Sequence, residues 1–367
     1  MHSSDLTRFA PILLAQAIRA PAVTVASAGR KEANVTRVMI TGGAGFLGSR
    51  LARQLLAAGS LDVAGGGPGR LSRLTLVDRV PAAADLAGHD RVEVVSGELA
   101  DVIAPGGTGH RALAEADVIF HLAAAVSGEC EADFDLGLRA NIHATESLLQ
   151  ACRALGSNPV VVFSSSVAVF GTSPEHPLPA VVQDGTLPNP QTSYGVQKLV
   201  CEQLLADFTR KGFLRGRAIR LMTVSVRPGA PNAAASGFLS GIVREPLTGH
   251  RATCPVAPDT EVALASPAKA IAALLCAATA SDESWGGRSA VTMPALTVSV
   301  GDMIAALERA AGPEVSALID IVPDPAVARM FATWPARINT GRAAGLGLAP
   351  DLSFDAVIQM HRNETGV

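Results

Sequence analysis

The chain has 367 residues, of which 48% are hydrophobic and 17% charged, and its formal net charge is −3. This composition permits a packed core and argues against a disordered chain. The charge is not gathered in basic clusters, which argues against a nucleic-acid partner. The best candidate for a membrane span, Ala270 to Ala280, is about half as long as the roughly 20 residues that a bilayer needs, so we expect a soluble protein with no membrane partner.

Five cysteines (Cys130, Cys152, Cys201, Cys254 and Cys276) are scattered without a C-x-x-C pair. This usage suits a reducing compartment and predicts neither a disulfide framework nor a metal site. Cys201 lies three residues after Lys198, and we interpret it as a buried thiol rather than a catalytic one.

Residues 1–36 differ from the rest because they are rich in Ala, Ser and Arg, with Asp5 as the only acid before Glu32. A cleaved targeting peptide, an unstructured extension or a start codon assigned too far upstream would each give this composition. We interpret residues 1–36 as a disordered extension and expect a cytoplasmic protein, or an organellar one if the extension is a transit peptide.

The first structured segment is a short apolar strand, 37–41, which runs into Gly42-Gly-Ala-Gly45-Phe46-Leu47-Gly48 and then a helical pattern through Leu56. In this position Gly42 allows a tight turn, Gly45 lets a diphosphate touch the backbone, and Gly48 lets the helix pack against the strand. The helix N-terminus adds amide donors for phosphates. The segment predicts a dinucleotide-binding loop.

A second strand, 74–77, ends at Asp78. An acid at this position hydrogen-bonds the adenosine ribose and repels a 2′-phosphate, which favours NAD over NADP. Arg79 is the opposing signal, because a guanidinium attracts that phosphate. The long spacing from Gly48 is explained by a flexible surface insertion at 64–69.

Further strands at 91–95, 116–124 and 158–163 alternate with helical segments. Near-continuous apolar strands in this alternation predict an α/β fold, a Rossmann-type doubly wound parallel sheet with helices on both faces. We assign 37–226 to an NAD-binding domain and 227–367 mainly to a smaller C-terminal substrate-binding lobe. In this scheme His121 is an interior histidine, Ser266-Pro267 begins a helix, and Trp334 packs in the smaller lobe.

The segment Ser193-Tyr194-Gly-Val-Gln-Lys198 starts a helix and puts tyrosine and lysine on one face, one turn apart. A tyrosine hydroxyl ordinarily titrates near pH ~10, and an ammonium group about 4 Å away favours its ionised form by roughly 4 kcal/mol. Such a pair can act as a general base near neutral pH. Tyr194 is the only tyrosine in the chain, so no second phenol competes for this role.

The glycine loop, Ser164-Ser-Ser166 and Tyr194-x-x-x-Lys198 together resemble the extended short-chain dehydrogenase/reductase superfamily, over nearly everything after residue 36. The segments 121–128, 132–138, 220–238, 244–247, 333–337 and 342–347 narrow the resemblance to the D-erythronate dehydrogenase family. Glu98, in place of the usual Asp, and Met222, in place of an expected Pro, depart from the pattern.

The resemblance implies an NAD-dependent enzyme that oxidises the C2 hydroxyl of a small sugar acid, such as D-erythronate, to the 2-oxo acid. Tyr194 would be the general base, Lys198 its activator, and Ser166, with Ser165 in reserve, would hold the reacting hydroxyl. A homodimer is common in this superfamily. The cofactor-binding residues implied are Gly42, Gly45, Phe46, Leu47, Gly48, Asp78, Leu99, Leu122, Ala123, Ala124, Ser127, Tyr194, Lys198 and Thr223.

For the substrate we expect Ser127, Ser166, Asn232 and Arg244, because a small carboxylate is oriented by charge-assisted hydrogen bonds. Arg244 is the first candidate for the carboxylate and Arg227 the second, although Arg244 could equally pair with Glu245 at the surface. Asn141 either supports the site or is a solvated helix residue. Alternative functions are a nucleotide-sugar epimerase or dehydratase with tightly bound NAD, and a non-catalytic cofactor sensor.

Overall fold

The computed structural model describes residues 35–229 and 236–367, which belong to one compact unit. The predicted N-terminal extension lies outside the described residues, except that Val35 and Thr36 already belong to the first strand, β1 (Val35–Thr41). Asn232 also lies outside them.

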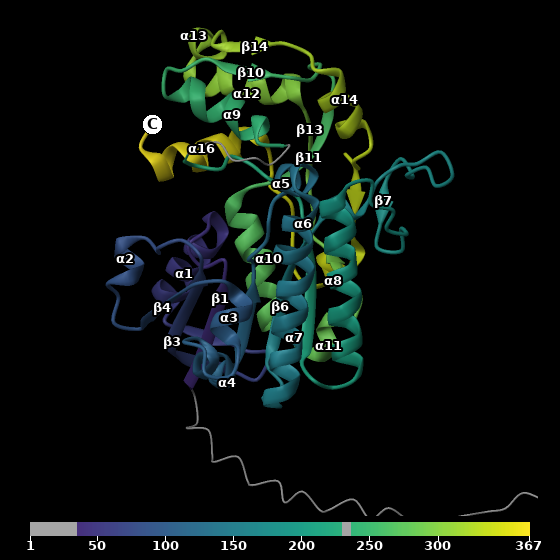
Figure 1. Ribbon diagram of the computed structural model, residues 1–367. Coiled ribbons are helices and arrows are strands. Elements are labelled where there is room, and N and C mark those ends of the chain that lie inside the picture. Colours follow the sequence, from purple (N-terminus) through teal and green to yellow (C-terminus); the bar gives the residue numbers. More distant parts are fainter. Residues whose placement is uncertain (1–34, 230–235) are drawn as a thin grey trace, which may run out of the picture. The chain divides into compact units, whose positions relative to one another are not determined.

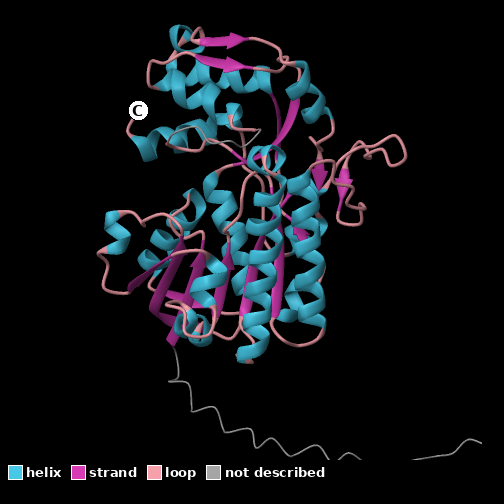
Figure 2. Ribbon diagram, viewed as in Figure 1, coloured by secondary structure: helices cyan, strands magenta, loops and turns pink. Residues whose placement is uncertain are grey.

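A parallel sheet forms the centre of the molecule (Figure 2). Its parallel strands follow the order β4-β3-β1-β5-β6-β8-β12. The bounds of the six strands beside β1 are β4 Val92–Ser96, β3 Pro68–Asp78, β5 Val118–His121, β6 Val160–Ser166, β8 Arg215–Leu221 and β12 Val291–Thr292. The strand order starts at β1 and extends first to one side, through β3 and β4, and then to the other side, from β5 to β12. This order confirms the predicted doubly wound α/β fold.

The glycine-rich stretch at 64–69 is more ordered than predicted. A short strand, β2 (Ser60–Asp62), pairs antiparallel with the beginning of β3, so that Pro68 and Gly69 are strand residues. The Gly67 amide donates to the Asp62 carboxylate at 2.9 Å, and the Ala64 amide donates to the Ala278 carbonyl at 2.9 Å. The predicted surface insertion is therefore the turn of a hairpin.

Helices cover both faces of the sheet, and successive strand residues alternate between two cores. Val38, Ile40 and Phe120 face one core, which contains α1 (Phe46–Ala58) and α10 (Pro267–Thr279). Met39 and Ile119 face the other core. Its helices are α3 (Leu99–Ile103), α4 (His110–Glu115), α7 (Ala144–Leu155) and α8 (Ser193–Arg210).

A second group of elements follows β8 and forms the smaller lobe at the top of Figure 1. Its main helices, α9 (Phe238–Leu247), α12 (Val300–Ala311) and α16 (Phe354–Thr365), bury an apolar cluster of their own that includes Leu239, Met303 and Ile358. The other lobe elements are β10 Ala252–Cys254, β11 Glu261–Ala265, β13 Leu296–Ser299, α13 Pro313–Ser316, β14 Ile319–Ile321 and α14 Pro325–Ala332. Residues beyond 226 also return to the sheet, through α10 and β12.

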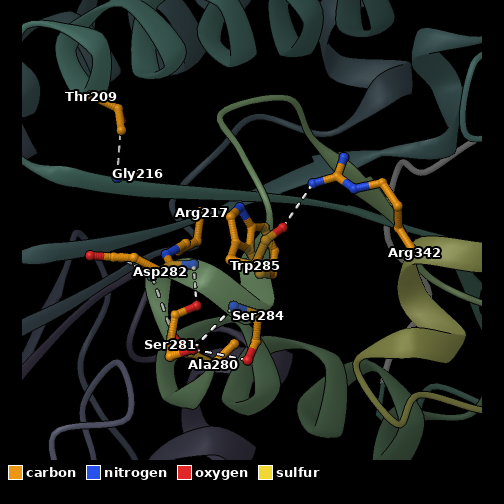
Figure 3. Close-up of polar contacts among 9 residues, drawn as sticks. All are labelled: Thr209, Gly216, Arg217, Ala280, Ser281, Asp282, Ser284, Trp285 and Arg342. Atoms are coloured by element: carbon orange, nitrogen blue, oxygen red, sulfur yellow. Dashed lines mark hydrogen bonds and ion pairs between the residues drawn. The ribbon is translucent and has the colours of Figure 1, made fainter.

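Helix α10 begins as predicted: the Ser266 hydroxyl accepts a hydrogen bond from the Lys269 amide, and Pro267 is the first helical residue. After this helix, Arg217 of β8 joins the short helix α11 (Asp282–Trp285) to the sheet (Figure 3). The buried guanidinium pairs with Asp282 and lies 5.2 Å from the centroid of the Trp285 ring. Arg342 of α15 (Gly341–Gly345) holds Trp285 from the other side by donating to its carbonyl at 3.1 Å. Within the described parts of the chain, no helix combines the length and hydropathy needed to cross a membrane.

Candidate active site

A cavity of about 300 Å³ lies at the carboxyl ends of the parallel strands, under residues of the smaller lobe. This is the edge at which ligands bind in open α/β sheets. Many residues predicted for the site line it, namely Gly42, Gly45, Phe46, Leu47, Gly48, Leu122, Ala124, Ser127, Ser166, Tyr194, Lys198 and Thr223. Leu221, Met222, Val224, Arg227, Ser236 and Trp334 also line it, on the side that leads into the lobe.

The glycine loop has no room for side chains. A Cβ at Gly48 would stand 2.1 Å from the Gly42 carbonyl oxygen, and one at Gly42, where φ is +72°, would stand 2.7 Å from the Ala123 nitrogen. The loop is thus a backbone cradle that ends at the N-terminus of α1, and such a cradle fits the diphosphate of a dinucleotide.

Asp78 lies at the end of β3 beside this cradle. Its carboxylate accepts hydrogen bonds from the Ala44 amide at 3.0 Å and the Arg79 amide at 2.7 Å, so that the side chain is fixed against the loop. The Arg79 guanidinium lies 3.6 Å from the Glu98 carboxylate, an acid that offsets its attraction for a phosphate. Leu99 is buried in the sheet core at the start of α3. These contacts are compatible with an NAD adenosine end held by Asp78.

A buried histidine, His121, holds the end of β5 in place. Nδ1 of His121 lies 2.7 Å from the Thr41 hydroxyl and Nε2 lies 2.9 Å from the Thr145 hydroxyl. Burial, and secondarily the charge of Lys198, lowers the pKa of His121 to about 3, so the ring is neutral and structural. This confirms the interpretation of His121 as an interior residue. The Thr41 hydroxyl also accepts from the Ala123 amide at 3.3 Å, which fixes the strand end facing Gly42.

Helix α8 carries Tyr194 and Lys198 and begins at the edge of the cavity. Its N-cap Thr192 accepts from the Gly195 amide at 3.1 Å, and the Ser193 amide donates at 2.7 Å to Glu131 of α5 (Ser127–Ala132). A Cβ at Gly195 would stand 2.2 Å from the Ala168 carbonyl oxygen. The glycine between Tyr194 and Lys198 therefore lets α8 lie directly against the 3₁₀ turn η2 (Val167–Val169) that follows Ser166.

Lys198 is buried and its ammonium is directed into the site. Its Nζ donates to the Ser164 carbonyl at 2.8 Å and lies 5.6 Å from the centroid of the Tyr194 ring. Tyr194 is half-buried and lines the same cavity as the glycine loop. The helical spacing thus brings the phenol, the ammonium and the dinucleotide cradle into one space.

The serines at the end of β6 have different partners. The Ser166 hydroxyl accepts from the Ala168 amide at 3.1 Å and lines the cavity. The Ser165 hydroxyl donates at 2.5 Å to Glu202, a buried residue one helical turn beyond Lys198. Arg220 of β8 completes a bidentate pair with Glu202, with nitrogen–oxygen distances of 2.9 and 2.7 Å. Ser165 is engaged in this buried network, so that Ser166 is the better candidate for contact with a substrate.

Asn141 is buried, so it is not a solvated helix residue. It lies in the π-helical turn η1 (Leu138–His143), between α6 (Phe134–Gly137) and α7. Its Oδ1 accepts from the Ala125 amide at 2.8 Å, and its Nδ2 donates to the Gln197 side-chain oxygen at 2.7 Å. Asn141 thereby connects the loop after β5, which lines the cavity up to Ser127, with the residue that precedes Lys198. Cys201 is also buried, and burial raises the pKa of its thiol, in line with a packing role.

The two candidate arginines are placed differently. Arg244 of α9 donates to the Arg227 carbonyl at 2.8 Å and pairs with Glu245 at 2.5 Å, and its side chain is not among those that line the cavity. Arg227 does line the cavity, where its Nε donates to the Val224 carbonyl at 3.1 Å. Burial lowers the pKa of Arg227, and the proximity of Tyr194 opposes this shift. The structure therefore brings the second candidate, rather than the first, into the site.

Several residues that line the cavity were not predicted as site residues, and Ser236 and Trp334 are two of them. Ser236 was noted only as part of the segment 220–238 that carries the family resemblance. Trp334 packs against the lobe core as predicted but also faces the cavity. Within residues 35–229 and 236–367, no group of three or more His, Cys, Asp or Glu side chains is arranged to hold a metal ion.

Residues 38–264 match the model of the NAD dependent epimerase/dehydratase family. D-Erythronate dehydrogenase of Cupriavidus necator is 49% identical over 90% of this chain and 99% of its own length. The enzyme of the same name from Haemophilus influenzae is 38% identical over 88% of this chain and 98% of its own. A crystal structure of a nucleoside-diphosphate-sugar epimerase from Agrobacterium tumefaciens superposes with a TM-score of 0.82 at 41% identity, covering 92% and 97% of the two chains. The chain therefore belongs to the NAD dependent epimerase/dehydratase family and is an NAD-dependent oxidoreductase.

Proposed function

We propose that this protein is a sugar-acid dehydrogenase that oxidises the C2 hydroxyl of a four-carbon aldonate, such as D-erythronate, to the 2-oxo acid. The single observation that carries the proposal is that Tyr194, Lys198 and Ser166 line one cavity with the glycine cradle. Full-length likeness to two enzymes named D-erythronate dehydrogenase supports the choice of substrate.

In this proposal NAD, when bound, accepts the hydride that leaves C2. Ser166 holds the reacting hydroxyl, and Tyr194 takes the hydroxyl proton as the C–H bond breaks. Lys198 keeps a positive charge next to the phenolate that acts as base, and the Ser164 carbonyl fixes its ammonium in place. The proton passes to Tyr194 and the hydride to the cofactor, so the formation of the carbonyl product needs no further reactant.

The carboxylate of the substrate needs a cationic partner because a tetronate offers little apolar area. We assign this role to Arg227, which lies in a largely desolvated position on the lobe side of the cavity. Hydrogen bonds to a charged group are stronger in such a place than in water. Ser127 and Thr223 border the same space.

A panel assay tests the function directly. Purified protein is incubated with NAD and with C4 to C6 aldonates or nucleotide sugars, and NADH is followed by absorbance. We expect stoichiometric NADH with a tetronate and a 2-oxo acid among the products. If only nucleotide sugars react and no net NADH forms, the chain is instead an epimerase, the second candidate that the Agrobacterium neighbour's name supports.

A further inference from the structure

A second, smaller cavity adjoins the one that contains Tyr194. The two share three lining residues, Val167, Thr223 and Trp334. Residues that line both spaces form the partition between them, and Trp334 is by far the largest of the three. Beyond the partition the smaller space continues along β11, beside Val262 and Ala263.

The indole of Trp334 is supported by other aromatic rings. Its centroid lies 5.0 Å from that of Phe331, which in turn lies 5.2 Å from that of Phe238 at an interplanar angle of 61°. Aromatic pairs at such separations stabilise one another beyond simple burial. The ring is therefore a rigid part of the wall rather than a freely rotating surface side chain.

The chain around Trp334 is attached to the segment that follows Ser166 and to the lobe. The Thr333 carbonyl accepts from the Thr172 amide at 3.2 Å, and the Arg337 carbonyl accepts from the Val182 amide at 2.9 Å. Just beyond it, β15 (Ile338–Asn339) pairs with β7 (Val182–Gln183). Arg337 also forms a bidentate pair with Glu261 of the lobe, at 2.9 and 2.8 Å. These contacts connect the tryptophan to the segment that follows Ser166.

We propose that Trp334 determines specificity by setting the longest carbon chain that the substrate cavity accepts. This inference rests on the proposed function. A tetronate held by Arg227 and Ser166 fits in front of the indole, whereas the extra CHOH groups of pentonates and hexonates meet it. Without the indole, the two spaces join and longer aldonates are accommodated.

The test is the ratio of kcat/KM for a pentonate to that for a tetronate, measured in the wild type and in Trp334→Ala, Trp334→Leu and Trp334→Phe. We expect the ratio to rise at least about tenfold in Trp334→Ala, less in Trp334→Leu, and little in Trp334→Phe, since one methylene-sized change in a pocket alters discrimination by about 10- to 200-fold. Trp285→Phe is the matched control, because Trp285 is the only other tryptophan, lies buried beside Arg217 of β8 and lines neither cavity. Its ratio should equal the wild-type value.

An unchanged ratio in folded, NADH-binding Trp334→Ala and Trp334→Leu, with a wild type that oxidises tetronates, overturns the inference and leaves the proposed function standing. A wild type that oxidises no aldonate overturns both.

A second readout uses the fluorescence of Trp334 in the Trp285→Phe background: titration with D-erythronate in the presence of NADH should change the emission of Trp334. The same titration of Trp334→Phe, in which only Trp285 emits, should leave the emission constant; a constant emission from Trp334 contradicts its place at the substrate.

Discussion

The two walls of the cavity are built in different ways. The sheet-side wall is made of short segments in which function and local structure coincide, such as the glycine loop before α1 and the first turn of α8. The lobe-side wall includes Arg227 and Ser236, from the segment that follows β8, and Trp334, from a segment far away in the chain. We infer that the sheet side carries the chemistry and that the lobe side selects the substrate. Substitutions on the first wall should then lower kcat, and those on the second should raise KM.

The largest effect is expected from Tyr194→Phe, which removes the proposed proton acceptor and keeps the ring. General-base catalysis contributes about 10²- to 10⁴-fold, and kcat should fall by that factor. The dissociation constant for NADH, measured by fluorescence titration, should stay near the wild-type value because the glycine cradle is unchanged. A variant with wild-type kcat would show that another group takes the proton and would break the division between the two walls.

Glu202→Gln should lower the free energy of unfolding by weakening the contacts behind the sheet-side wall. The substitution leaves the buried Arg220 guanidinium without its carboxylate, and breaking a buried pair in this way costs about 3–5 kcal/mol. Urea denaturation measures this loss. The double variant Glu202→Leu/Arg220→Met, which removes both charges, should recover much of it. Equal stabilities of Glu202→Gln and the wild type would mean that the pair does not hold β8 and α8 together.

Arg227→Met tests the lobe-side wall. Loss of a charge-assisted hydrogen bond to the substrate carboxylate, worth about 1.5–3 kcal/mol, should raise KM for the sugar acid about 10- to 100-fold. The change in kcat should be smaller, and NADH affinity should be retained. Steady-state kinetics with varied tetronate separates these quantities. A fall in kcat at constant KM would place Arg227 with the catalytic residues instead.

His121 should make the stability of the sheet-side wall depend on pH. Its pKa is about 3 in the folded protein and near 6.5 when unfolded, so the unfolded chain binds the extra proton in that interval. The stability due to the neutral ring is complete above about pH 6.5 and is lost as the pH falls, by about 1.4 kcal/mol per pH unit. The variant His121→Gln should show a flatter decline of unfolding free energy between pH 6.5 and 4. Parallel curves for the two proteins would contradict this assignment.

The same difference between the walls explains what the sequence could predict. Gly42, Gly45 and Gly48 are predictable because a strand, a turn and a helix in succession require them at that spacing, and Tyr194 and Lys198 because helical geometry alone brings them together. The hairpin at 60–70 was missed because its glycines and proline read as a loop, although β3 supplies the pairing partner.

Arg227, Arg244 and Trp334 have no such local rule. Arg244 was the first candidate for the carboxylate, with a pair between Arg244 and Glu245 as the alternative, and the structure shows that pair. Trp334 was read as a core residue because tryptophan beside proline is usually buried, and its position on the cavity depends on pairing between β7 and β15, which are distant in sequence. Predicting such residues requires the tertiary path of the lobe.

The smallest effect is expected from Arg244→Gln, and it sharpens the comparison within the lobe-side wall itself. Among the described residues, Arg244 is connected to the site by its hydrogen bond to the Arg227 carbonyl. The substitution removes this bond and the pair with Glu245. A hydrogen bond that involves a charged group contributes about 1.5–3 kcal/mol, and most of the loss should appear as a lower unfolding free energy, with KM for a tetronate changed by less than about threefold. If Arg244→Gln instead raises KM as much as Arg227→Met does, Arg244 is the carboxylate partner and must leave Glu245 when the substrate binds. The ratio of the KM values of Arg227→Met and Arg244→Gln thus decides which arginine contacts the substrate. Only the arginine in direct contact loses a charge-assisted hydrogen bond to the carboxylate when it is replaced.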